Sequence, residues 1–206
     1  MASIASKSSA ETLTVQAFIF YDVEDRAFER AAKTMAHEIK GEAIQEFLKV
    51  KTKNDFLESW KAIRSQAENN SAVVVAVHVF THASKQDDQQ DGLEFAQTGN
   101  SSGTLTRSDI EGLPRLPWAD DNQGVHLYGC NTGLIGEREW APGSAFTQSQ
   151  RVTTYALTGF GYFSSNPNRY VEISNADDVV YLYAYKRGRN GLLGDGSRMK
   201  EKVFKP

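Results

Sequence analysis

The sequence predicts an α/β protein with a mostly parallel central sheet of about six strands, flanked by helices and carrying a small hairpin insertion. Two observations predict this class. Strand-like runs alternate with amphipathic helical patterns through the first part of the chain, as in successive βα units. In addition, the run Ala72–Phe80 (AVVVAVHVF) is almost wholly apolar, which is typical of a strand buried on both faces of a parallel sheet.

The first elements follow from periodicity and capping signals. Leu13–Tyr21 is a β-branched and aromatic run of strand length, and an acidic turn follows it. From Arg26, apolar residues keep helical spacing until Gly41, a residue suited to a helix C-terminus. Ala43–Val50 predicts a second strand. Asn54 is expected to cap a second helix, whose apolar face comprises Phe56, Leu57, Trp60, Ile63 and Ala67.

The second half is less regular. Ser84–Asn122 contains glycines, prolines and a polar stretch, and predicts loops around a small hairpin and a helical turn begun by Ser108. Val125–Tyr128 predicts another buried strand. Ser144 is expected to cap a helix that runs to Tyr155. Two further strands are expected near Gly159–Phe163 and Val179–Tyr185.

Length and composition bound the organisation. The 206 residues predict one domain over residues 13–186, a disordered segment over 1–12 and a solvated basic tail over 187–206. A net charge of −3 gives no electrostatic case for binding nucleic acid or an anionic membrane. The start of the chain has no apolar signal region, so we expect a cytoplasmic protein. Export without a cleavable signal stays open, and so does the oligomeric state.

The chemistry centres on Cys130, the only cysteine of the chain. A single thiol cannot form an intramolecular disulfide or a multi-cysteine zinc site, so it is either a small core residue or a reactive group. The two apolar strands end in similar patterns, because His78 precedes His82 by four residues as His126 precedes Cys130. Residues four apart in a strand share a face. If the two strands are parallel neighbours in register, His82 lies near Cys130 at the carboxyl edge of the sheet.

An imidazole beside a thiol has a clear chemical use. Only the thiolate is a good nucleophile, and a neighbouring histidine can take the thiol proton and later protonate a leaving amine. The sequence therefore favours nucleophilic catalysis over core packing for Cys130. It predicts no metal site and no cofactor, since no histidine pair has metal-ligand spacing on a predicted helix and no phosphate-binding glycine motif is present.

The order of these motifs resembles the caspase-like (clan CD) cysteine peptidases. An apolar strand ending in Thr81-His82-Ala83-Ser84 is followed by a glycine-containing hairpin and a second apolar strand ending in Gly129-Cys130-Asn131-Thr132-Gly133. The family includes caspases, metacaspases, bacterial CHAT domains and the peptidase domains of bacterial toxins. The resemblance implies that His82 is the general base and acid, that Cys130 is the nucleophile and that a protein or peptide is the substrate. A bacterial effector or toxin role would follow by analogy.

The resemblance also raises two questions about individual residues. The family usually has glycine after its histidine, where a backbone N–H helps to bind the oxyanion, whereas this chain has Ala83. Ala83 and Cys130 would supply the oxyanion amides if the φ angle of Ala83 is negative. Asp22 would favour a basic P1 residue in the substrate, or else it caps the following helix. The alternative function is a catalytically silent caspase-like fold that acts as a protein-interaction module.

Overall fold

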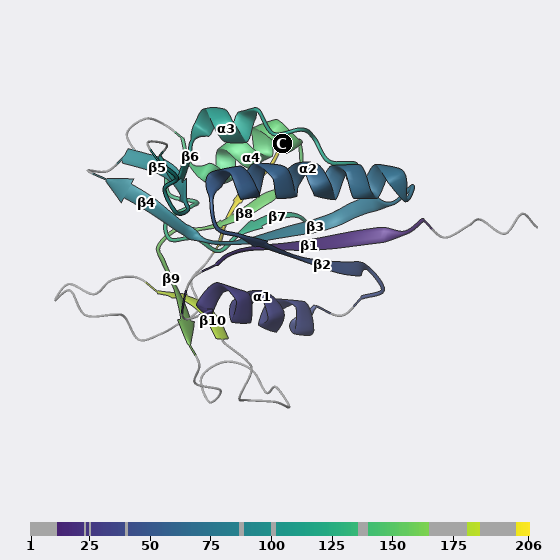
Figure 1. Cartoon of the computed structure of the whole chain (residues 1–206), viewed down its shortest axis with the longest axis horizontal. Helices are drawn as coiled ribbons and strands as arrows, with labels where there is room; N and C mark the ends of the chain where they lie inside the picture. The colour runs from purple at the N-terminus through teal and green to yellow at the C-terminus, as the bar shows by residue number, and fades with distance from the viewer. Residues whose placement is uncertain are drawn as a thin grey trace, which may run out of the picture.

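A six-stranded sheet forms the centre of the molecule (Figure 1). The structure, a computed structural model, describes residues 12–22, 24, 26–39, 41–86, 89–99, 102–135, 140–164, 181–185 and 201–206. The strand order is β11-β8-β7-β3-β1-β2, and all neighbours are parallel except β11 and β8. This confirms the predicted mostly parallel sheet. Its strands are β1 (Thr14–Tyr21), β2 (Ile44–Val50), β3 (Val73–Phe80), β7 (Gly124–Leu127), β8 (Thr154–Leu157) and β11 (Glu201–Phe204).

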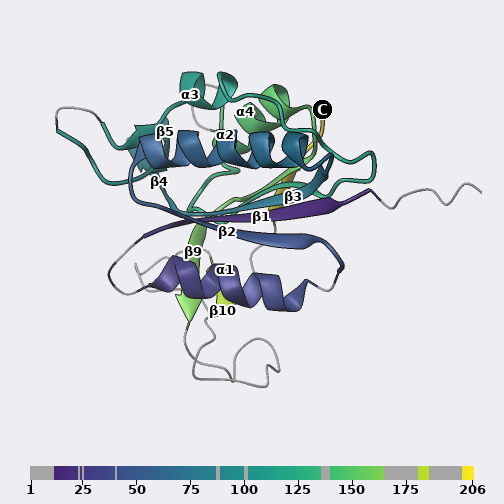
Figure 2. The ribbon, with the colours of Figure 1, turned by 45° about the vertical axis from the view of Figure 1, so that its right-hand side comes forward.

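Helices cover both faces of this sheet (Figures 1 and 2). On one face lie α2 (Lys53–Asn69), α3 (Arg107–Glu111) and α4 (Pro142–Gln150). The buried side chains of α2 there include Phe56, Trp60 and Ile63, in the positions expected from the helical spacing. On the other face lies α1 (Ala27–Glu38), which packs Phe28 and small residues against Phe18 and Phe80 of the sheet. None of the described helices is long and apolar enough to cross a membrane.

Two small antiparallel sheets complete the fold. The first has the order β4-β5-β6, with β4 (His82–Gln86), β5 (Gln89–Glu94) and β6 (Thr104–Leu105), and corresponds to the predicted hairpin insertion. The second pairs β9 (Phe160–Ser164) with β10 (Tyr181–Tyr185) beside α1, so these two expected strands form but stay outside the central sheet.

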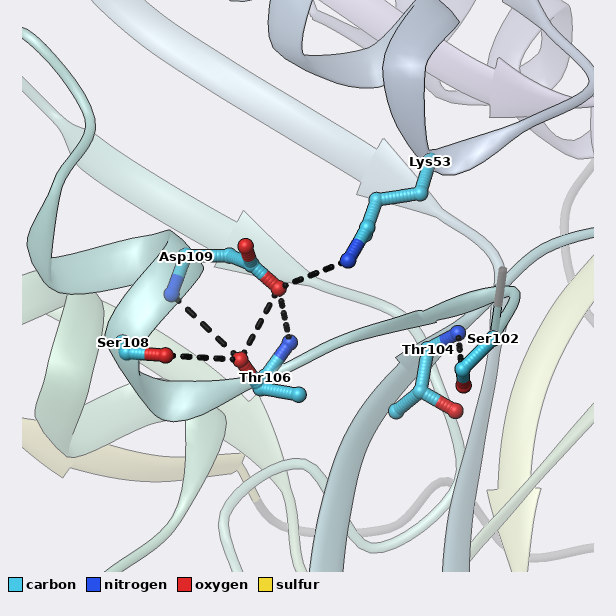
Figure 3. A network of polar contacts seen from close by, with 6 residues as sticks. All are labelled: Lys53, Ser102, Thr104, Thr106, Ser108 and Asp109. Carbon is cyan, nitrogen blue, oxygen red and sulfur yellow. Dashed lines mark hydrogen bonds and ion pairs between the residues drawn. The ribbon is translucent and has the colours of Figure 1, made fainter. Parts of the chain in front are cut away.

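A polar network holds the insertion against the main body (Figure 3). Thr106 caps α3 in a reciprocal arrangement, with its side chain accepting from the Asp109 N–H and the Asp109 carboxylate accepting from the Thr106 N–H. The same carboxylate lies 3.3 Å from Lys53 Nζ at the start of α2. The network therefore connects the start of α3 to the start of α2. Because Thr106 directly follows β6, it also fixes the last strand of the small sheet.

Three predicted helix boundaries are wrong. The cap of α2 is Thr52, which pairs reciprocally with Asp55, because a hydroxyl three residues before a carboxylate completes a capping box that Asn54 cannot. Ser144 lies inside the first turn of α4, where its Oγ accepts from the Ala141 N–H at 3.0 Å. The helix α1 ends at Glu38 with Ile39 as its cap, before Gly41.

The end of the chain differs most from expectation. Residues predicted to extend α4 to Tyr155 instead form β8, because Arg151 adopts a left-handed φ of 56° and ends the helix before a β-branched run. Glu201–Phe204, expected in a solvated tail, forms the antiparallel edge strand β11 against β8. Phe204 packs against the core. The expected disorder over residues 1–11 and most of the basic tail lie outside the described residues.

Candidate active site

The pairing of β3 with β7 places the two candidate motifs side by side. The strands are parallel neighbours, with His78 opposite His126, as predicted. One rung further, Phe80 stacks on Tyr128 with ring centroids 4.5 Å apart. His82 follows the end of β3 by two residues and Cys130 follows the end of β7 by three, so both residues lie just beyond the carboxyl ends of these two neighbouring strands. A Cβ built at Gly129 would lie 3.1 Å from the Thr81 carbonyl oxygen, so the segment that carries the cysteine abuts the segment that carries the histidine.

Below this edge, the face under α1 carries a ladder of stacked rings. It runs across neighbouring strands as Phe47, Phe18, His78, His126 and Tyr155, with centroid separations of 5.1, 4.9, 4.7 and 4.5 Å. Each step is a register pair of the sheet. The two histidines of the ladder are thus packed as flat rings within the sheet.

The ladder histidines are held neutral. His78 is 2% exposed, and burial, followed by the nearby His126, lowers its pKa well below the usual value. Its Nε2 lies 3.0 Å from the side-chain nitrogen of Gln16, and its Nδ1 lies 3.2 Å from the Tyr128 hydroxyl. Burial also lowers the pKa of His126 to about 4, although its contact with the Gln123 carbonyl oxygen opposes the shift.

Cys130 is half-buried at the top of β7, and its sulfur contacts the backbone of Gly161. The Gly161 N–H donates to Sγ at 3.3 Å, and the thiol lies 3.8 Å from the Gly161 carbonyl oxygen. Burial raises the pKa of the Cys130 thiol, and the negative charge of Glu94 adds to the increase. Backbone N–H groups of Gly161 and of Cys130 itself act in the opposite direction, because they stabilise a thiolate. The resting cysteine is therefore a thiol with two donors aimed at its sulfur.

The loop that follows Cys130 is fixed from several sides. Thr132 is fully buried, and its hydroxyl donates to the Gly129 carbonyl oxygen at 3.0 Å and accepts from the Leu157 N–H at 3.2 Å. Asn131 has a φ of 57° and donates its N–H to the Gly159 carbonyl oxygen at 2.8 Å. A turn with these contacts to β8 and to the β8–β9 connection holds the backbone of Cys130 in one orientation.

His82 is the first residue of β4 and is exposed. Its ring meets Phe28 edge-on at 4.8 Å and Tyr21 edge-on at 6.0 Å between centroids, so β1 and the first turn of α1 form one side of its environment. In the β4–β5 ladder the residue opposite His82 is Glu94. The His82 ring thus packs against aromatic side chains near the carboxyl edge of the sheet, and Glu94 is its cross-strand neighbour.

The candidate oxyanion residue Ala83 has no backbone strain. It lies in β4 opposite Leu93. Its φ angle is not positive, in contrast to those of Asn131 and Arg151. The condition set by the sequence, a negative φ at this position, is therefore met. Alanine keeps the backbone N–H that glycine would offer, so the substitution does not by itself remove an oxyanion donor.

Asp22 follows β1 at the same edge. Its N–H donates to the Val50 carbonyl oxygen at 2.7 Å, and its carboxylate lies 3.2 Å from Lys49 Nζ. The residue that caps α1 is Arg26, so the alternative role of Asp22 as a helix cap is wrong. The Asp22 side chain is 34% exposed, which leaves its carboxylate accessible beside an exposed lysine.

Sequence reasoning missed Glu94, the cross-strand neighbour of His82, and Gly161, whose backbone contacts the Cys130 sulfur. Their positions follow from the hairpin register and from the path of the chain after β8, and neither shows in local periodicity. Within the described part of the chain, no group of three or more His, Cys, Asp or Glu side chains is placed to hold a metal ion.

No family model matches this chain, and no curated protein shows significant similarity in sequence.

Proposed function

We propose that this chain is a cysteine peptidase that uses a dyad of His82 and Cys130, as its resemblance to the caspase-like peptidases implies. One observation carries the proposal, namely the parallel register of β3 and β7, with His78 opposite His126 and Phe80 stacked on Tyr128. His82 and Cys130, the only cysteine of the chain, come two and three residues after the ends of these two strands, which supports a site at the carboxyl edge of the sheet. That edge is where α/β proteins bind their ligands.

The proposed reaction proceeds through a thioester. His82 takes the proton of the Cys130 thiol, and the sulfur attacks the peptide carbonyl carbon to give a tetrahedral oxyanion. The N–H groups of Ala83 and Cys130 stabilise this oxyanion. Collapse breaks the C–N bond, and the His82 imidazolium donates its proton to the departing amine. Water then attacks the thioester while His82 takes its proton, which releases the acid and restores the thiol.

The electrostatics of Cys130 favour base-assisted attack over a resident thiolate. Because burial raises the pKa of the thiol, His82 must accept the proton as the nucleophile forms. The Gly161 N–H, 3.3 Å from Sγ, then stabilises the developing negative charge on sulfur. Reactivity should therefore depend strongly on His82.

The rate of alkylation by iodoacetamide at pH 7 tests the dyad directly. We expect Cys130 to react faster than the thiol of a short unstructured peptide, and we expect His82→Ala to remove that advantage. His37→Ala is the matched control, since His37 is an exposed histidine of α1. A rate at or below that of the peptide thiol, unchanged by His82→Ala, would contradict the proposal.

For the substrate we propose a preference for Arg or Lys at P1, with Asp22 as the recognition residue. Its accessible carboxylate follows β1, next to Tyr21, whose ring contacts His82. Fluorogenic peptides that end in Arg or Lys should be cleaved faster than those that end in Asp, and Asp22→Ala should weaken that preference by about tenfold. Lys49→Met should strengthen it, because Lys49 competes for the carboxylate. Cleavage after Asp that is unchanged by Asp22→Ala would overturn the assignment.

A catalytically silent interaction module is the second candidate function. It is favoured by the raised pKa of the Cys130 thiol and by the way both side chains are packed, the sulfur against Gly161 and the His82 ring against Phe28. For such a module, Cys130 would alkylate slowly and no peptide would be cleaved. The iodoacetamide experiment therefore distinguishes the two candidates.

A further inference from the structure

We propose that Glu94 is a positioning residue for His82, holding the imidazole toward Cys130 and stabilising its protonated form. This inference rests on the proposed function, since it assigns a third member to the His82–Cys130 site. The juxtaposition that carries it is the cross-strand pair His82 and Glu94 in the β4–β5 ladder, at the edge of the sheet where Cys130 follows β7.

The hairpin register fixes the two side chains relative to each other. Residues directly opposite in an antiparallel pair point to the same face with Cβ atoms about 5 Å apart, so a glutamate opposite a histidine is within hydrogen-bonding reach of the ring. The backbone at this point is anchored, because the Thr81 hydroxyl donates to the Glu94 carbonyl oxygen at 2.8 Å. This anchor uses no side-chain atom of Glu94, so it survives substitution of the carboxylate.

The Glu94 charge also reaches the nucleophile. Its carboxylate contributes to the raised pKa of the Cys130 thiol, so the Glu94 charge acts on Cys130 as well as standing opposite His82 in the hairpin. Glu94 is half-buried, so solvent screens these interactions only in part. A carboxylate disfavours a thiolate but favours an imidazolium. Because His82 is its direct cross-strand partner, we expect the favourable effect on His82 to exceed the unfavourable effect on Cys130.

The proton balance of the activated state makes this testable. The thiol proton moves from Sγ to the unprotonated ring nitrogen of His82, leaving a thiolate, an imidazolium and the unchanged carboxylate of Glu94. On reaction with iodoacetamide an S–C bond forms, iodide leaves, and the imidazolium proton passes to solvent. With His82 present, Glu94 should therefore promote alkylation, whereas without His82 only its repulsion of the thiolate should remain.

The experiment is a double-mutant cycle of iodoacetamide alkylation rates at pH 7. We expect Glu94→Gln to slow alkylation about fivefold in the protein with His82, and to speed it about twofold in the His82→Ala background. Glu94→Ala should slow the first reaction further than Glu94→Gln, because the amide oxygen of glutamine still accepts a hydrogen bond from the ring. Glu58→Gln, which removes an exposed glutamate paired with Lys61, controls for net charge.

Each outcome separates this inference from the proposed function. If alkylation depends on His82 but Glu94→Gln has no effect, or has the same sign in both backgrounds, Glu94 does not position His82 and the dyad stands. If alkylation does not depend on His82, the proposed function itself fails. A Glu94→Gln protein that unfolds at the same temperature as the parent excludes loss of folding as the cause of slower alkylation.

Discussion

Two pairs of residues, one within neighbouring strands and one just beyond their ends, differ in their surroundings. The inner rung is the register pair His78 and His126 of β3 and β7, and we use outer rung for His82 and Cys130, which follow each of these by four residues and lie beyond the carboxyl ends of the two strands. The inner rung lies in a stack of rings, and its first histidine is 2% exposed. At the outer rung His82 is exposed and Cys130 is half-buried. Position relative to the edge of the sheet, more than residue type, therefore decides which histidine is exposed.

The side chains around His78 in the inner rung keep its imidazole neutral. Gln16 donates to Nε2 of His78, and the Tyr128 hydroxyl meets Nδ1, so both ring nitrogens are satisfied with the imidazole neutral. A proton added to this rung would be buried next to a second imidazole 4.7 Å away. At the outer rung the neighbours are a carboxylate on β5 and backbone donors on Gly161, which favour charge separation.

Acid should destabilise the folded protein mainly through the inner rung, and this loss of unfolding free energy is the largest effect we expect. Because the folded state holds the pKa of His126 at about 4, below the usual value of 6.5, the unfolded chain binds more protons between those values and stability falls as the pH falls through that window. From pH 7.5 to pH 5, His126 alone should cost about 2 kcal/mol of unfolding free energy. The lowered pKa of His78 adds to the loss. Urea unfolding at the two pH values measures it.

His126→Phe sharpens this prediction. Phenylalanine keeps a flat ring between His78 and Tyr155 but cannot be protonated, so most of the His126 share of the acid loss should disappear. His37→Gln, which removes an exposed histidine of α1, should leave the pH dependence almost unchanged. An equal acid loss in the parent and in His126→Phe would show that the inner rung is not the acid-sensitive element.

Tyr128→Phe should separate stability from reactivity. Tyr128 is 5% exposed, and its hydroxyl lies beside Nδ1 of His78. Removal of this hydroxyl leaves Nδ1 without that partner, so the unfolding free energy should fall by about 1–2 kcal/mol. The ring stack on Phe80 is retained, so the alkylation rate of Cys130 should stay within about twofold of the parent. Tyr155→Phe, at the half-buried end of the ladder, serves as the control and should cost less. A large fall in Cys130 reactivity would instead show that the His78 environment affects the reactivity of Cys130.

The two rungs also show what the sequence could predict. Alternation in strands and the equal spacing of His78–His82 and His126–Cys130 were enough to predict that β3 and β7 are parallel neighbours with His78 opposite His126, because only the pairing of two buried strands was needed. The partners of the outer rung could not be predicted. Glu94 faces His82 through a hairpin whose register shifts between Ser84 and Lys85, and such an irregularity is set by three-dimensional packing.

The errors at the end of the chain have a similar origin. The segment that became β8 follows the α4 pattern without a glycine or proline to mark the change, and the helix ends through a left-handed arginine, which composition does not reveal. β11 is a short strand with only two apolar residues, and Phe204 packs beside Gly143, where an added Cβ would lie 2.5 Å from the Phe204 ring. Long-range contacts of this kind leave little local signal.

Ala83→Gly should have the smallest effect and tests the backbone of the outer rung. Ala83 is in β4 without a positive φ, so alanine and glycine present the same N–H to an oxyanion and the peptidase kcat/KM should change less than about twofold. Stability should fall by about 0.5–1 kcal/mol, because glycine in a strand loses more conformational entropy on folding. Peptide hydrolysis and urea unfolding measure the two quantities. A tenfold rise in kcat/KM would mean that alanine restrains the oxyanion amide, and that the departure from glycine limits catalysis at this edge.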